Sequence, residues 1–92
     1  MNKNKLYLLS LSSDLTRITQ SIQKGSFKNS QQFSYQAQKW LKKIDQTTLK
    51  PYMKKILKEI KKDLKQKNNL IKAEQALMYS TLVQNYSIKI LN

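Results

Sequence analysis

The chain has 92 residues and a net charge of +13, from 18 Lys and Arg residues against 5 Asp and Glu residues. This length fits one domain with a modest core, and a single Gly and a single Pro exclude a turn-rich β protein. Because Cys and His are absent, the chain forms no disulfide and lacks the commonest catalytic base and metal ligand.

The first predicted helix covers about residues 5–24. Its apolar residues recur in alternating steps of three and four, namely Leu8, Leu11, Leu15, Ile18 and Ile22. That spacing places them along one face of an amphipathic helix, whose other side is mainly Ser, Thr and Gln. Gly25 is suited to end this helix, and Ser26 to cap the next one.

The apolar run from Leu6 to Leu11 is too short for a signal peptide, which needs about 7–15 apolar residues. No stretch approaches the roughly 20 apolar residues of a membrane-spanning helix. The absence of Cys fits a reducing compartment. We therefore expect a cytoplasmic protein that does not insert into membranes.

The second predicted helix covers about residues 27–45. Its apolar face consists of Phe33, Ala37, Trp40, Leu41 and Ile44, which indicates core packing for Trp40. Tyr35 projects on the other side with Lys39 and Lys42, where its ring could stack on a base of single-stranded nucleic acid. The ordinary alternative is a Tyr at the rim of a bundle with its hydroxyl in water.

The third predicted helix covers about residues 48–66, with Pro51 tolerated in its first turn. Seven lysines fall within an arc of about 140° at 100° per residue: Lys50, Lys54, Lys55, Lys58, Lys61, Lys62 and Lys65. The opposite arc is apolar: Leu49, Met53, Ile56, Leu57, Ile60 and Leu64. This pattern predicts a helix with a buried apolar side and a cationic outer side.

The last predicted helix covers about residues 69–91 and is apolar on most sides. One stripe, assigned to the core, consists of Ile71, Met78, Tyr79, Leu82, Val83, Tyr86 and Ile90. A second stripe consists of Leu70, Ala73, Leu77, Ile88 and Leu91. Because a small monomer could hardly surround such a helix, the second stripe predicts a homodimer interface. The alternative is a tight monomer with these side chains exposed.

Four helices joined by short links predict an all-α fold. We expect one domain, residues 1–92, folded as a small antiparallel (up-down-up-down) four-helix bundle.

The chain contains few of the residue combinations that enzymes use for catalysis. Of the five carboxylates, only Glu59 and Asp63 share a helix face, and neighbouring lysines offer them weak exposed ion pairs. One Gly cannot build a Gly-rich phosphate loop. We therefore expect a protein that is not an enzyme, with no catalytic residue, cofactor or metal site.

The lysines predict an accessory protein that binds nucleic acid, either RNA or nonspecific DNA, through the phosphate backbone. Lys lacks the bidentate fork of Arg, which favours backbone contacts over base readout. The predicted binding residues are Lys39, Lys42, Lys43, Lys50, Lys54, Lys58, Lys61, Lys62 and Lys65.

Two alternatives compete with this interpretation. The lysines can be a solvated face, enlarged by the codon usage of an AT-rich genome, on a helical assembly module that dimerises through the last helix. An acidic protein or an anionic membrane surface is the other kind of partner that such a charge can attract.

Overall fold

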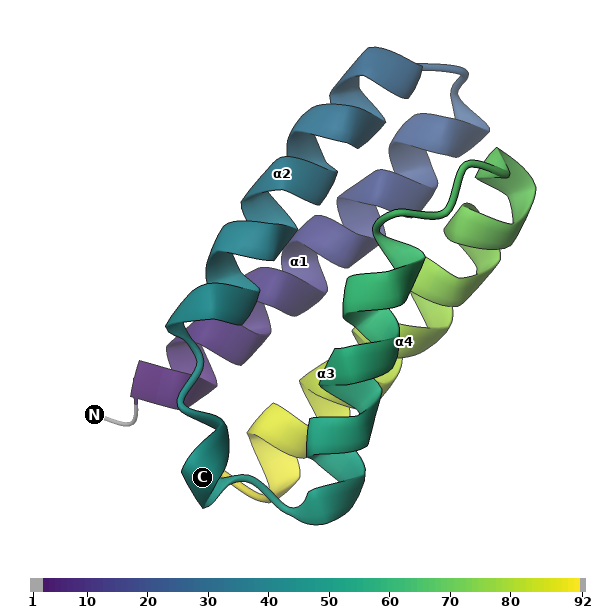
Figure 1. Cartoon of the computed structure of the whole chain (residues 1–92). Coiled ribbons are helices and arrows are strands. Elements are labelled where there is room, and N and C mark those ends of the chain that lie inside the picture. Colours follow the sequence, from purple (N-terminus) through teal and green to yellow (C-terminus); the bar gives the residue numbers. More distant parts are fainter. Residues whose placement is uncertain (1–2, 92) are drawn as a thin grey trace.

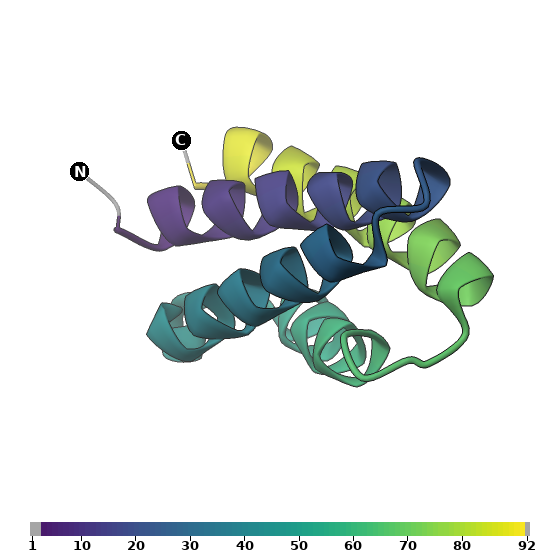
Figure 2. The same ribbon diagram turned by 90° about the horizontal axis from the view of Figure 1, so that it is seen from above.

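The computed structural model describes residues 3–91, which form four α-helices (Figure 1). These are α1 (Lys3–Gln23), α2 (Phe27–Lys43), α3 (Pro51–Asp63) and α4 (Asn69–Lys89), with a 3₁₀ turn, η1 (Gln46–Thr48), before α3. Successive helices run in opposite directions, which confirms the predicted all-α bundle. Figure 2 shows two layers, with α1 beside α4 in one and α2 with α3 in the other.

Local chemistry explains where the helices begin and end. Gly25 has a φ of 74°, a left-handed conformation that ends α1 and that residues with a Cβ rarely adopt. Asn68 accepts a hydrogen bond from the Ile71 amide and so caps α4. The third helix is shorter than the predicted 48–66, because Asp45 caps the turn η1 and Pro51 then opens α3.

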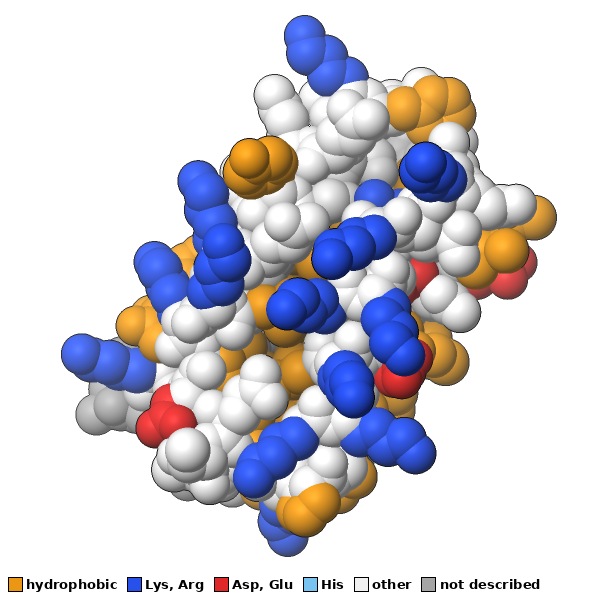
Figure 3. Space-filling model, viewed as in Figure 1, with side chains coloured by type: hydrophobic (Ala, Val, Ile, Leu, Met, Phe, Trp, Pro, Cys, Tyr) orange, Lys and Arg blue, Asp and Glu red, His pale blue; other side chains and the backbone are white. Residues whose placement is uncertain are grey.

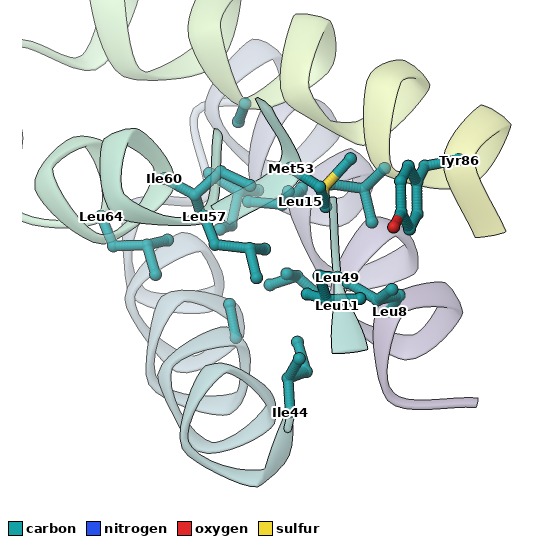
Figure 4. Close-up of a cluster of buried hydrophobic side chains, with 14 residues drawn as sticks. Leu8, Leu11, Leu15, Ile44, Leu49, Met53, Leu57, Ile60, Leu64 and Tyr86 are labelled. Carbon is teal, nitrogen blue, oxygen red and sulfur yellow. The ribbon is translucent and has the colours of Figure 1, made fainter. Parts of the chain in front are cut away.

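The core is built from the apolar faces of α1 and α3 together with residues from α2, α4 and the α2–α3 link (Figure 4). Leu8, Leu11, Leu15 and Ile18 of α1 are fully buried, as is Met53 of α3. Each such side chain contributes about 1.5–3 kcal/mol of transfer free energy. The α1 and α3 faces read from the sequence are therefore the ones that pack inward.

Helix α4 packs on α1 through small residues. Ser12 donates its hydroxyl to the Ser80 carbonyl at 2.8 Å, and Ser80 donates its own to the Ser12 carbonyl at 3.0 Å. Thr19 donates to the Ala73 carbonyl at 2.8 Å. Short side chains that reach the backbone of the other helix require a close approach of the two helix axes. The buried residues of α4 here include Ala76, Val83 and Ser87.

This packing turns part of the expected core stripe of α4 outward, while Val83 and Tyr86 of that stripe are buried as expected. Its large apolar residues are exposed on an arc of about 140°, which we call the outer face of α4: Leu70, Ile71, Leu77, Met78, Leu82 and Ile88. The assignment of Ile71, Met78, Leu82 and Ile90 to the core was therefore wrong. Ala73, placed in the dimer stripe, is buried against α1, and Leu91 packs partly against the core.

Helix α2 is held on α1 by an aromatic and charged cluster. The Trp40 indole donates to the buried Asp14 carboxylate at 3.0 Å, and Tyr7 stacks on Trp40 with ring centroids 5.9 Å apart. Arg17 lies 3.6 Å from Asp14 and covers the ring of Phe33. Burial raises the pKa of Asp14, and the Trp40 hydrogen bond and Arg17 oppose that rise. These contacts fix α2 on the side of α1 away from α4.

Candidate nucleic-acid interface

Helix α3, which carries most of the predicted binding lysines, is tied to α4 at both ends. At its start, the Lys50 amide donates to the Tyr86 hydroxyl at 3.0 Å. Past its end, the Lys72 ammonium donates to the Leu64 carbonyl at 3.3 Å, where a cation also suits the helix dipole. These two contacts orient α3, and they do so from the side opposite its lysines.

The link between α2 and α3 is fixed to the start of α1. The Asn4 amide nitrogen donates to the Asp45 carbonyl at 2.7 Å, and the Asp45 backbone amide donates to the Asn4 side-chain oxygen at 2.9 Å. The pair of bonds sets where the chain turns toward α3. Thr47 donates to the Asp45 carboxylate, which lowers the pKa of that exposed group.

Helix α3 packs mainly on α4 and touches α2 only lightly. The gap between α2 and α3 contains a hollow of about 320 Å³. Its lining is Gln38, Leu41, Lys42, Gln46, Leu57, Lys61 and Lys65. Figure 3 shows hydrophobic surface between the lysines in this part of the molecule. The hollow thus combines an apolar floor with a cationic rim.

A second hollow, of about 580 Å³, continues from the first along α2 and shares Gln38 with it. Its lining is Phe27, Ser30, Gln31, Ser34, Tyr35, Gln38, Leu64, Gln66, Lys67, Asn69 and Lys72. We call the two hollows together the α2–α3 groove. No carboxylate lines either of them within the described residues.

Four lysines occupy the side of α3 and of the turn after it that borders this groove. Lys61 and Lys65 line it directly. Lys54 and Lys58 share their flank, since all four fall within an arc of about 60° at 100° per residue. All four are exposed. We call Lys54, Lys58, Lys61 and Lys65 the lysine flank, and Lys42 faces it from α2.

The other predicted binding lysines are exposed but point elsewhere. The Lys43 ammonium lies 4.9 Å from the centroid of the Trp40 ring, on the α1 side of α2. Lys62 lies 3.8 Å from Glu59 and is directed to the opposite flank of α3. Lys39 lies on the outer side of α2, and Lys50 precedes α3. Of the nine predicted lysines, five therefore border the groove or its flank, and four lie elsewhere on the surface.

Glu59 and Asp63 were predicted to be exposed together, but Asp63 is buried. Asp63 is only 4% exposed, and neither of its carboxylate oxygens has a hydrogen-bond partner within the described residues. Burial raises its pKa to about 6, while Lys72 acts in the opposite direction. Burial likewise lowers the pKa of Lys72. The prediction of exposure was wrong, because Asp63 lies on the side of α3 that packs against α4.

The sequence reasoning missed the groove and, with it, Lys67. It considered each helix face separately and did not address the space between α2 and α3. The sequence does contain an indication of the groove. Helix α2 carries two small residues, Ser30 and Ser34, on the side that faces α3, and both are buried. Side chains of that size cannot fill the space between two helices.

Comparison of the chain with family models, with curated proteins and with solved structures finds no match. None of the helices in residues 3–91 combines the length and the apolar character needed to span a bilayer. The same residues contain no group of three or more potential metal ligands among His, Cys, Asp and Glu.

Proposed function

We propose that this protein binds nucleic acid through the phosphate backbone, using the lysine flank with Lys42 facing it across the groove. One observation carries the proposal: the flank presents four exposed ammonium groups, none of which forms an ion pair with a carboxylate of residues 3–91. Within residues 3–91 the ion pairs are Arg17 with Asp14 and Lys62 with Glu59. The flank lysines therefore keep their charge for a ligand.

The spacing of the flank suits a run of phosphates. Steps of four, three and four residues along the chain separate these lysines by about 4.5–6 Å in rise. Flexible Lys stems can adjust that spacing to a strand. Each neutralised phosphate releases counterions, so the affinity is expected to fall steeply with salt and to depend little on base sequence.

Fluorescence anisotropy with short RNA and DNA at several salt concentrations tests this function. Contact with about five phosphates predicts a log–log salt slope of roughly −3.5 to −4.5. The variant Lys54/Lys58/Lys61/Lys65→Gln should make the slope shallower by about 3–4. The absence of binding by micromolar protein at about 50 mM salt would contradict the proposal.

A matched control removes the same charge from elsewhere. Lys3, Lys24, Lys28 and Lys89 are exposed and lie outside the groove lining. Replacing these four by Gln lowers the net charge equally but should change the slope by less than about 1. Equal losses in the two variants would mean that total charge, and not the lysine flank, governs binding.

A second candidate function is assembly of two copies through the outer face of α4. Six large apolar side chains are exposed there, with Leu70 at 69%, and contiguous exposed apolar surface marks interaction sites. The charged residues of α4 are Lys72, Glu74 and Lys89, of which Lys72 is buried. Two chains of charge +13 could meet on this nearly neutral face and keep their lysines apart.

Sedimentation equilibrium separates this function from the first. A parent dimer should become a monomer in Leu77→Glu and in Ile88→Glu. The control Leu6→Glu alters an equally exposed Leu on α1 and should leave the dimer intact. A parent chain that stays monomeric at high concentration would refute the assembly proposal without affecting nucleic-acid binding.

A further inference from the structure

We infer that the α2–α3 groove selects single-stranded over duplex nucleic acid, with the Tyr35 ring stacking on a base. This inference rests on the proposed nucleic-acid function and names the class of strand that the groove accepts. It is supported by two features of the groove, its apolar floor beneath a cationic rim and the position of Tyr35. Binding of the phosphate backbone alone requires neither feature.

The groove has an apolar floor beneath its cationic rim. Leu41 and Leu57 line the lower hollow, and Leu64 lines the upper one. A phosphate backbone alone would use the lysines and leave the partly exposed Leu41 of this floor in water. A ligand that satisfies both parts must place negative charges along its edge and flat or apolar groups toward the floor.

A single strand meets that description and a duplex does not. The bases of a single strand have free faces, which can lie on apolar or aromatic side chains while the phosphates follow a cationic groove. In a duplex the same faces are stacked inside the helix. The hollow of about 320 Å³ beside Lys42 and Lys61 can receive a base but has no room for a double helix.

Tyr35 lies in the second hollow, where a base of a strand bound at the lysines could reach its ring. Its side chain lines the upper hollow and is 70% exposed. The ring–ring contacts within residues 3–91 are Tyr7 with Trp40 and Tyr52 with Tyr86, so the face of Tyr35 is open to a ligand. Seven residues separate it from Lys42 on α2, a rise of about 10 Å.

The length of the groove sets the size of the strand. Helix α2, one wall of the groove, has 17 residues and is about 25 Å long, so the groove can follow only a short strand. Gln31, Gln38 and Gln66 also line the groove. Their amides can donate to and accept from any base edge, so only a weak sequence preference is expected.

An acidic amphipathic peptide would also match an apolar floor with a cationic rim. The observations favour a nucleic acid, because the exposed Tyr35 and the amide-rich lining suit stacked, hydrogen-bonding bases better than Glu and Leu side chains. The peptide is therefore included as a competing ligand in the test.

The test measures anisotropy of labelled strands of about 12 nucleotides, single-stranded and as the matching duplex, at about 50 mM salt. The parent should bind the single strand at least tenfold more tightly than the duplex. Tyr35→Ala should weaken single-strand binding by about 5- to 100-fold and leave duplex binding unchanged, since stacking on one aromatic ring contributes that much. Tyr35→Phe keeps the ring and should bind like the parent.

Tyr52→Ala serves as the matched control, because Tyr52 is a half-exposed Tyr outside the groove. Tyr52→Ala should change the preference for single strand over duplex little. The melting temperature of each variant shows whether the fold is kept. Equal affinity for strand and duplex, or no effect of Tyr35→Ala, would overturn the inference while leaving backbone binding intact. If neither nucleic acid binds but a helical Glu/Leu peptide does, both the inference and the proposed function are refuted.

Discussion

Helix α3 is amphipathic and helix α4 is apolar on most sides, and the two helices bury different kinds of residue. Helix α3 buries Met53, Leu57 and Ile60 and exposes its lysines. Helix α4 buries Ala73, Ala76 and Ser80 and exposes large apolar residues such as Leu77 and Met78. The difference teaches that hydrophobic size alone does not decide which side of a helix faces a core.

The physical reason lies in what each helix packs against. Helix α3 packs on the core through large side chains, which hold its axis farther from the neighbouring helices. Helix α4 lies directly on α1, where Ser12 and Thr19 hydrogen-bond to its carbonyls. Large residues at that contact would separate the helices and leave those hydroxyls without partners, which costs about 1–3 kcal/mol for each buried group.

The largest expected effect comes from breaking the α1–α4 contact. Ser80→Leu should destabilise the protein by about 3–5 kcal/mol, because it overpacks a close contact and removes buried hydrogen bonds. Urea unfolding followed by far-UV circular dichroism measures the loss. The neighbouring control Thr81→Leu is exposed and should change stability by less than about 0.5 kcal/mol. Similar losses in both variants would contradict the inward orientation of Ser80.

A smaller effect is expected where α3 meets α4. Asp63 has a pKa raised from 3.8 to about 6. The folded state therefore holds its proton more tightly than the unfolded chain, and the associated stability is present below about pH 4 and is lost as the pH rises through 6. Asp63→Asn should stabilise the protein by about 1–3 kcal/mol at pH 8 and by little at pH 4.

Asp45 serves as a control, because its contribution to stability should change with pH in the opposite direction. Its pKa is lowered by the hydrogen bonds from Thr47, so its contribution is present near neutral pH and is lost on acidification. Asp45→Asn should therefore destabilise slightly at pH 8. A stability gain for Asp63→Asn that does not depend on pH would show that charge is not the cause.

The smallest effect is expected on the lysine flank itself. Neighbouring like charges along a helix are destabilising by about 0.2–0.5 kcal/mol per pair. Replacing Lys54, Lys58, Lys61 and Lys65 by Gln should therefore raise stability by about 0.5–1.5 kcal/mol at low salt. Thermal melts at low and at about 1 M salt should converge, because salt screens the repulsion. A loss of stability would mean that these lysines support the fold.

Much of the fold could be predicted because its signals are local. The spacing of Leu8, Leu11 and Leu15 indicates the buried face of α1, and the unusual φ of Gly25 follows from its position between two periodic segments. The lysine flank could also be predicted, since helical spacing alone places those residues together. The burial of Asp63 could not be predicted, because it depends on which side of α3 meets α4.

The sequence by itself determined the four helices, the buried faces of α1 and α3 and the grouping of lysines on α3. These features follow from backbone geometry and from the spacing of side chains along one helix. The tertiary structure decided the orientation of α4, the burial of Asp63 and the groove that joins Lys42, Lys61 and Tyr35. Each of those depends on the distance between two helices, which is set by side chains on both of them together.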